Sequence, residues 1–141
     1  MNPTITKRSV YRNIHIGQIV KYRLPLAGWV SILHRISGAL MFVLLPFVIW
    51  MFDASVTSQT SYDRFMAVFA AGTGIVPALL LKLIALALIW AFLLHLIAGL
   101  RHLWMDLSHH AVDLRPGRQT ATFTLVASVL LTLAFGYTLF F

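Results

Sequence analysis

The stretch from His95 to Asp106, written His-Leu-Ile-Ala-Gly-Leu-Arg-His-Leu-Trp-Met-Asp, decides how the rest of this chain is interpreted. On a helix that turns by about 100° per residue, four of its residues fall within about 60° of one another: His95, Gly99, His102 and Asp106. This spacing predicts a polar stripe on an otherwise apolar helix. Ala91 and Ala98 flank the stripe, which leaves room beside His95 for a flat, bulky ligand. His95 is therefore a candidate metal ligand.

The composition is that of a membrane protein. Of the 141 residues, 60% are hydrophobic, and the mean hydropathy is +0.85. The formal charge of +7 comes from residues beside the hydrophobic runs, where they set topology and meet anionic lipid headgroups rather than nucleic acid. The chain has no cysteine, so it cannot itself hold a thiolate zinc site or a cysteine-ligated iron–sulfur cluster. A redox cofactor here must be held by histidine or by a partner.

Three apolar runs are each long enough to cross a bilayer as a helix. The first, at about 26–52, follows Pro25, a residue that suits the start of a helix. Its ~27 residues would form ~40 Å of helix. The other two runs lie at about 75–100 and 120–141. We therefore predict an all-α membrane protein, with one domain over residues 1–141 and three transmembrane helices.

The distribution of basic residues predicts the topology, because Lys and Arg near helix ends are retained on the cytoplasmic side. The tail over residues 1–25 and the connection over 101–119 hold eight of the eleven Lys and Arg residues, whereas the connection over 53–75 holds only Arg64. We expect a multi-pass membrane protein, with a cytoplasmic N-terminus and a C-terminus on the opposite side of the membrane.

A second polar cluster lies in the first apolar run. Four of its residues have the spacing i, i+3, i+4 and i+7 and so share one helix face: Ser31, His34, Arg35 and Gly38. By helix rise, His95 lies ~9 Å inside the cytoplasmic end of its helix, and the His34 and Arg35 pair lies ~10–14 Å from the cytoplasmic start of the first. Because the two clusters are at similar depth, we predict that their faces point at each other.

Arg35 needs an anionic or aqueous partner, because an arginine within hydrocarbon costs at least ~2.5–3.5 kcal/mol on insertion scales. The first run contains no acidic residue to receive it. Either Arg35 reaches the cytoplasmic headgroups, or it meets an anion from outside the chain, such as a haem propionate or a quinone oxygen. For His95 the alternatives are a hydrogen bond to a neighbouring helix and ligation of haem iron. The small residues beside His95 and the cationic cluster at matching depth favour haem.

These motifs resemble those of a known family. The segment Ser31-Ile-Leu-His34-Arg35-Ile-Ser-Gly38, followed one helix later by His95-x3-Gly99-x-Arg101-His102-x3-Asp106, resembles the cytochrome b subunits of succinate dehydrogenase. These are the larger membrane anchors of succinate:quinone oxidoreductase, respiratory complex II. The match covers essentially the whole chain in length, number of spans and motif order. It departs from the family at the N-terminus, where Tyr11-Arg-Asn-Ile-His15-Ile replaces the usual Arg-Pro-x-Ser-Pro-His-Leu.

The resemblance implies a role for each matched residue. His95 would be an axial ligand of haem b, with the second axial histidine supplied by the smaller anchor subunit. Ser31 and Arg35 would line the ubiquinone site, and His34 and Arg35 would meet the haem propionates. His102 and Asp106 match the pattern as well, with a secondary role in propionate contact or proton delivery.

The resemblance also implies how the work is divided among subunits. The chain has no nucleotide-binding glycine motif, so flavin and iron–sulfur clusters would belong to a flavoprotein and an iron–sulfur partner. This chain would not oxidise succinate itself. It would form part of a helical bundle with the second anchor and hold ubiquinone near the cytoplasmic surface. Ser31 would hydrogen-bond a quinone oxygen, and Arg35 would stabilise the negative charge that develops after the first electron.

Two other functions stay open at this point. One is a haem-less, quinone-binding anchor of a fumarate reductase. The other is a small transporter or channel subunit, in which Arg35 and His95 would line a polar pathway. Three spans without an internal repeat are few for a transporter, which favours the respiratory function.

Overall fold

The structure is a computed structural model that describes residues 13, 15–108 and 113–140. Over these residues the chain is helical, without strands, and its elements are α1 (Ile16–Val20), α2 (Leu26–Val56), α3 (Gln59–Ala71), α4 (Ala78–Leu107) and α5 (Leu114–Phe140). Three of them, α2, α4 and α5, are long and apolar enough to cross a membrane. The predicted all-α membrane fold with three transmembrane helices is therefore confirmed. Much of the tail predicted over residues 1–25 lies outside the described residues.

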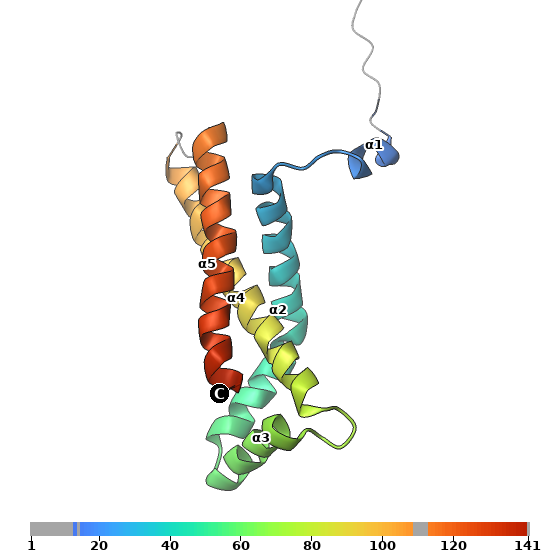
Figure 1. Cartoon of the computed structure of the whole chain (residues 1–141), viewed down its shortest axis with the longest axis vertical. Coiled ribbons are helices and arrows are strands. Elements are labelled where there is room, and N and C mark those ends of the chain that lie inside the picture. Colours follow the sequence, from blue (N-terminus) through green and yellow to red (C-terminus); the bar gives the residue numbers. More distant parts are fainter. Residues whose placement is uncertain (1–12, 14, 109–112, 141) are drawn as a thin grey trace, which may run out of the picture.

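The three long helices run alongside one another, with α4 packed against both α2 and α5 (Figure 1). The short helix α3 lies across one end of this bundle, between the end of α2 and the start of α4, and the C-terminus of α5 ends near it (Figure 1). At the opposite end, α1 lies apart from the bundle and is joined to α2 by an extended segment (Figure 1). The start of α2 and the end of α4 therefore lie at the same end of the bundle, opposite α3.

The long helices do not begin and end where the apolar runs do. Pro25 and Pro77 precede α2 and α4 in extended conformation, so each proline stands where its missing N–H breaks no helix bond. However, α4 continues past residue 100 to Leu107, and α5 begins at Leu114 rather than near residue 120. Pro116 lies in the first turn of α5, where proline is tolerated. Polar residues thus extend helices that the hydropathy pattern alone would end.

Small residues let α5 pack closely against α4. The buried residues of α5 recur every three or four positions and are Gly117, Ala121, Thr124, Ser128, Thr132 and Gly136. The buried hydroxyls donate to carbonyls of their own helix, as Thr132 Oγ1 does to Ser128 O at 2.7 Å. Large apolar side chains such as Phe42 and Phe123 are exposed instead. This distribution is typical of membrane helices, whose contacts rely on close packing of small residues while large apolar side chains face lipid.

Candidate functional site

The structure brings the two predicted clusters together where α2 crosses α4. The rings of His34 and His95 are stacked, with their centroids 4.0 Å apart and their planes inclined by 13°. The ring of His102 lies 5.1 Å from that of His34 in a tilted arrangement. All three histidines are half-buried. The two helices thus contribute a contiguous cluster of imidazoles at the end of the bundle opposite α3.

The hydrogen bonds of His95 fix which of its ring nitrogens carries the proton. His95 Nδ1 lies 2.9 Å from the backbone oxygen of His34. The hydrogen bond to a neighbouring helix, given above as the alternative to haem ligation, is therefore present, and it uses only one of the two ring nitrogens. A carbonyl oxygen can only accept, so Nδ1 must carry the hydrogen and donate it. In the neutral imidazole, Nε2 is then the nitrogen with the free lone pair. Among the described residues, Nε2 makes no hydrogen bond, so this lone pair is available to a ligand.

Of the two glycines at this helix crossing, Gly38 makes the close approach feasible, whereas Gly99 leaves room for a side chain. A Cβ atom at Gly38 would lie 2.8 Å from His95 Cε1, closer than real Cβ contacts allow. A Cβ atom at Gly99 would lie 3.5 Å from His34 Nε2, which is ordinary van der Waals contact. The imidazole of His95 therefore lies directly on the backbone of α2 at Gly38, and a side chain there would displace it.

The remaining predicted residues lie on the same two helices as this cluster. Ser31 is half-buried and Arg35 is exposed, one helical turn apart on α2. Asp106 is exposed in the last turn of α4. Within the part of the chain that the structure describes, none of these three side chains makes a hydrogen bond to another residue. The predicted face of α2 is therefore split, because His34 and Gly38 face α4 while Arg35 faces outward.

Two residues of this region were missed in the sequence analysis. Ser37 is buried, and its hydroxyl lies 3.2 Å from His95 Nδ1. Its position three residues after His34 is the signal that could have placed it on the same face. Arg101, expected in the connection over 101–119, lies inside α4 and is 6% exposed. It donates to Thr120 Oγ1 at 3.0 Å and to Gly117 O at 3.3 Å, and so joins α4 to α5.

This arrangement fits a haem more readily than a bare metal ion. Over the described residues, no group of three or more His, Asp or Glu side chains could hold a metal ion. His95 instead offers one oriented lone pair on a half-buried ring whose other nitrogen is bonded to a backbone carbonyl. Axial histidines are held in this way, because a bond at one ring nitrogen fixes the orientation of the other. The donor set therefore fits a group that takes a single axial ligand from this chain.

Fold and site together define a class: an all-helical membrane protein of three spans with a stacked histidine pair at one helix crossing. The sequence comparisons narrow the class. The family model described as "Succinate dehydrogenase/Fumarate reductase transmembrane subunit" matches residues 7–135. The chain belongs to this family, which confirms the resemblance found in its motifs.

Individual relatives agree with this assignment. The chain is 32% identical over 110 residues to a succinate dehydrogenase cytochrome b556 subunit from Paracoccus denitrificans, covering 78% of each chain. A protein of the same name from Rickettsia felis (strain ATCC VR-1525 / URRWXCal2) is 27% identical over 131 residues, which is 92% of this chain and 96% of the relative. The similarity thus extends over nearly all of the chain and includes all three long helices.

Proposed function

We propose that this chain is a membrane-anchor, cytochrome b-type subunit of a succinate dehydrogenase complex. It binds haem b jointly with a second anchor subunit and forms part of the site where ubiquinone is reduced by electrons from succinate. The observation that carries the proposal is the 2.9 Å hydrogen bond between His95 Nδ1 and His34 O, because it leaves Nε2 as the ligand for haem iron. The relatives named cytochrome b556 subunits support the same cofactor.

The residues around His95 have the chemistry to hold the other groups of a haem. A guanidinium pairs with a carboxylate in two parallel hydrogen bonds, so Arg35 is a suitable partner for a propionate. The imidazole of His34, stacked on that of His95, is a second propionate donor. His102 contacts His34 and takes a supporting role, as does Asp106 one turn further along α4. When bound, the haem supplies a one-electron redox centre next to the quinone site.

The quinone site is proposed on the side of α2 that carries Ser31 and Arg35. The hydroxyl of Ser31 donates a hydrogen bond to one quinone oxygen, and the exposed guanidinium of Arg35 stabilises the negative charge that develops there on reduction. Reduction to quinol takes up two electrons and two protons. A site near the end of the transmembrane helices can draw these protons from water at the membrane surface.

The other subunits supply what this chain lacks. With no cysteine in its sequence, it takes electrons from clusters held by an iron–sulfur subunit, which receives them from a flavoprotein that oxidises succinate. The second axial histidine comes from the smaller anchor. The distribution of basic residues supports a histidine cluster that faces the cytoplasm and a C-terminus that faces the periplasm. The relatives from Paracoccus denitrificans and Rickettsia felis support a complex that resides in a bacterial inner membrane.

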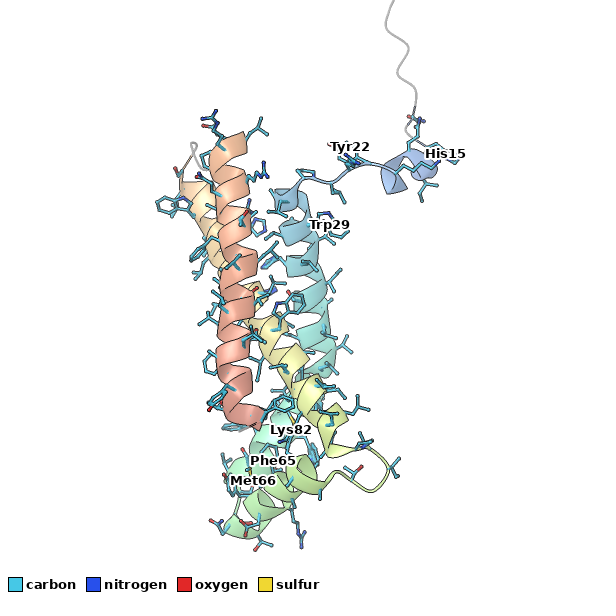
Figure 2. All side chains as sticks on the ribbon, in the orientation of Figure 1. His15, Tyr22, Trp29, Phe65, Met66 and Lys82 are labelled. Carbon is cyan, nitrogen blue, oxygen red and sulfur yellow. The ribbon has the colours of Figure 1, made fainter. Side chains whose placement is uncertain are left out.

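Substitution of His95 tests the haem assignment. In the purified complex, His95→Leu removes the axial ligand, so we expect loss of the low-spin, bis-histidine b-type spectrum. His15→Leu is the control, because His15 is exposed and lies outside the bundle, before α1 (Figure 2). A native haem spectrum in assembled His95→Leu complex would refute the assignment.

A second experiment tests the quinone assignment. Ser31→Ala and Arg35→Ala should lower ubiquinone reduction while succinate oxidation with an artificial electron acceptor stays largely intact. Ser55→Ala and Arg64→Ala are matched controls, because both residues lie near α3, at the other end of the bundle. An equal fall of both activities in assembled Ser31→Ala and Arg35→Ala complexes would contradict a role in the quinone step.

The family also includes fumarate reductase subunits, so a haem-less anchor is the second candidate. A reduced-minus-oxidised spectrum of the purified complex distinguishes the two, because a haem-less anchor has no b-type band. The proteins that co-purify test the remaining alternative. A transporter or channel subunit would be isolated without the flavoprotein and the iron–sulfur subunit.

A further inference from the structure

Ser37 is a buried polar residue that contacts His95. Its side chain is 4% exposed, and its hydroxyl donates to the backbone oxygen of His34 at 2.9 Å. The same oxygen atom, Ser37 Oγ, lies 3.2 Å from His95 Nδ1. Ser37 therefore bonds within its own helix and contacts the imidazole of the neighbouring one.

The directions of these hydrogen bonds follow from the carbonyl oxygen of His34, which can only accept a hydrogen. His34 O receives hydrogens from both the Ser37 hydroxyl and His95 Nδ1. The lone pairs of Ser37 Oγ then face the N–H of His95, which is shared between the two oxygens. A three-centre bond of this kind restricts the rotation of the imidazole about its Cβ–Cγ bond more tightly than a bond to one acceptor does.

Packing restricts the imidazole in the other directions. The ring of His95 lies against the backbone at Gly38 on α2, and the ring of His34 is stacked on it. Sliding or tilting the ring would bring it into one of these neighbours. The hydroxyl of Ser37 thus adds to the restraint on rotation of the ring about its Cβ–Cγ bond, because this rotation moves Nδ1 away from its two acceptors.

We propose that Ser37 is a positioning residue for the haem, acting through His95; this inference rests on the proposed function. Two oxygen acceptors at Nδ1 increase the electron density that Nε2 donates to iron, and this favours the ferric state. They also set the plane of the ring relative to the haem and to the axial histidine of the partner anchor. Ser37 therefore lowers the reduction potential of the haem and holds its ligand geometry.

The test compares Ser37→Ala with the parent in the assembled complex. Removing the hydroxyl leaves His34 O as the sole acceptor, so the haem midpoint potential should rise. Substituting a hydrogen-bond partner of a metal ligand commonly changes affinity by ~10-fold or more. A tenfold change in the preference for ferric over ferrous iron would correspond to ~59 mV for a one-electron couple. The low-spin ferric electron paramagnetic resonance signal should also shift, because it reports the relative orientation of the two imidazoles.

The chain offers a matched control and a rescue variant. Ser128 is buried as well, and its hydroxyl donates to the carbonyl three residues earlier, Leu125 O. It lies on α5, and among the described residues it makes no hydrogen bond to a histidine. Ser128→Ala should therefore leave the potential and the resonance signal unchanged. Ser37→Thr retains the hydroxyl and should restore both values toward those of the parent.

Each outcome bears on one of the two proposals. A raised potential and a shifted signal in Ser37→Ala, with parental values in Ser128→Ala, support the inference. Parental values in a Ser37→Ala complex with full haem content overturn it, while His95 remains the ligand. Equal shifts in Ser37→Ala and Ser128→Ala also overturn it, since burial of any serine would then suffice. A native spectrum in His95→Leu would instead refute the haem assignment on which this inference rests.

Discussion

The two ends of the bundle are packed in different ways. At the histidine end, formed by the start of α2 and the second half of α4, small residues bring the helices together around bonded polar groups. The buried residues of α4 lie between Ala91 and Arg101, and one of them, Leu93, also lines the groove described next. At the α3 end, side chains from α2, α3, α4 and α5 leave a groove of about 820 Å³ with an almost wholly apolar lining. The histidine end is close-packed around polar groups, whereas the α3 end contains an open, apolar groove beside the contact of α4 with α5.

This difference indicates where the molecule needs a single conformation. At the histidine end, a stacked ring pair and hydrogen bonds from His95 Nδ1 to Ser37 Oγ and His34 O define the position of one imidazole. An axial ligand requires this accuracy, because a small misplacement weakens the bond to iron. At the α3 end, the groove walls are flexible apolar side chains such as Met41, Met66 and Leu88, which can repack.

The largest difference between the two ends is expected when one glycine at each end is replaced by alanine. In Gly38→Ala the new Cβ would meet the His95 ring at 2.8 Å, and in Gly136→Ala it would meet Leu86 Cδ1 at 2.7 Å. The imidazole is held by hydrogen bonds and stacking, so Gly38→Ala should displace it and cost ~1–3 kcal/mol of stability as overpacking. The terminal methyl of Leu86 can rotate away, so Gly136→Ala should be close to neutral.

Haem content per assembled complex and the thermal midpoint of unfolding measure both effects. Gly99→Ala is an internal control, because its Cβ would lie at ordinary contact distance from His34. We expect haem loss only in Gly38→Ala. If Gly136→Ala were as damaging as Gly38→Ala, the two ends would not differ in rigidity as described.

The next contrast concerns two arginines near the histidine end. Arg101 is buried and donates to Thr120 Oγ1 and Gly117 O, whereas Arg118, early in α5, is exposed. Arg101→Met removes charge-assisted bonds between α4 and α5, which are worth ~1.5–3 kcal/mol. Arg118→Met should change stability by less than ~0.5 kcal/mol. Denaturant unfolding of the complex in detergent gives both values, and equal values would mean that burial of Arg101 has no energetic role.

The sequence predicted the helices and the level of the two clusters, because both follow from local pattern. Apolar runs set the spans, and helix rise sets the depth of His34 and His95. The sequence did not predict how α2 is rotated about its own axis, that is, which of its faces contacts α4. The face assigned to Ser31, His34, Arg35 and Gly38 is turned by roughly 60° from the face that contacts α4, which includes Val30 and Ser37. That rotation depends on which side chains α4 and α5 present, and no single helix encodes it.

Arg101 was misplaced for a related reason. The hydropathy pattern shows where an apolar run stops. The helix itself continues until its backbone hydrogen bonds end, which can be several residues later. Here α4 continues to Leu107, and α5 starts at Leu114 because Pro116 fits its first turn. An arginine expected in a polar connection is thus enclosed between two helices. The roles in haem and quinone binding follow from the family resemblance and stay predictions until the variants are measured.

The smallest effect is expected at Lys82, the charged residue that lines the open groove. Its ammonium lies 5.3 Å from the centre of the Phe140 ring, near the α3 end (Figure 2). A cation–π contact of this kind contributes ~0.5–1 kcal/mol at an exposed site. Lys82→Met keeps most of the side-chain length, so stability should fall by no more than this amount, and haem content should not change.

A double-mutant cycle with Phe140→Leu isolates the contact between the two side chains. A coupling free energy below ~1 kcal/mol is expected, because the groove walls can repack around a shorter or uncharged partner. A coupling above ~2 kcal/mol, or haem loss in Lys82→Met, would mean that the α3 end is as tightly determined as the histidine end. Side-chain packing would then be rigid along the whole of α4. The difference in packing between the two ends would not explain why the ligand site lies at the histidine end.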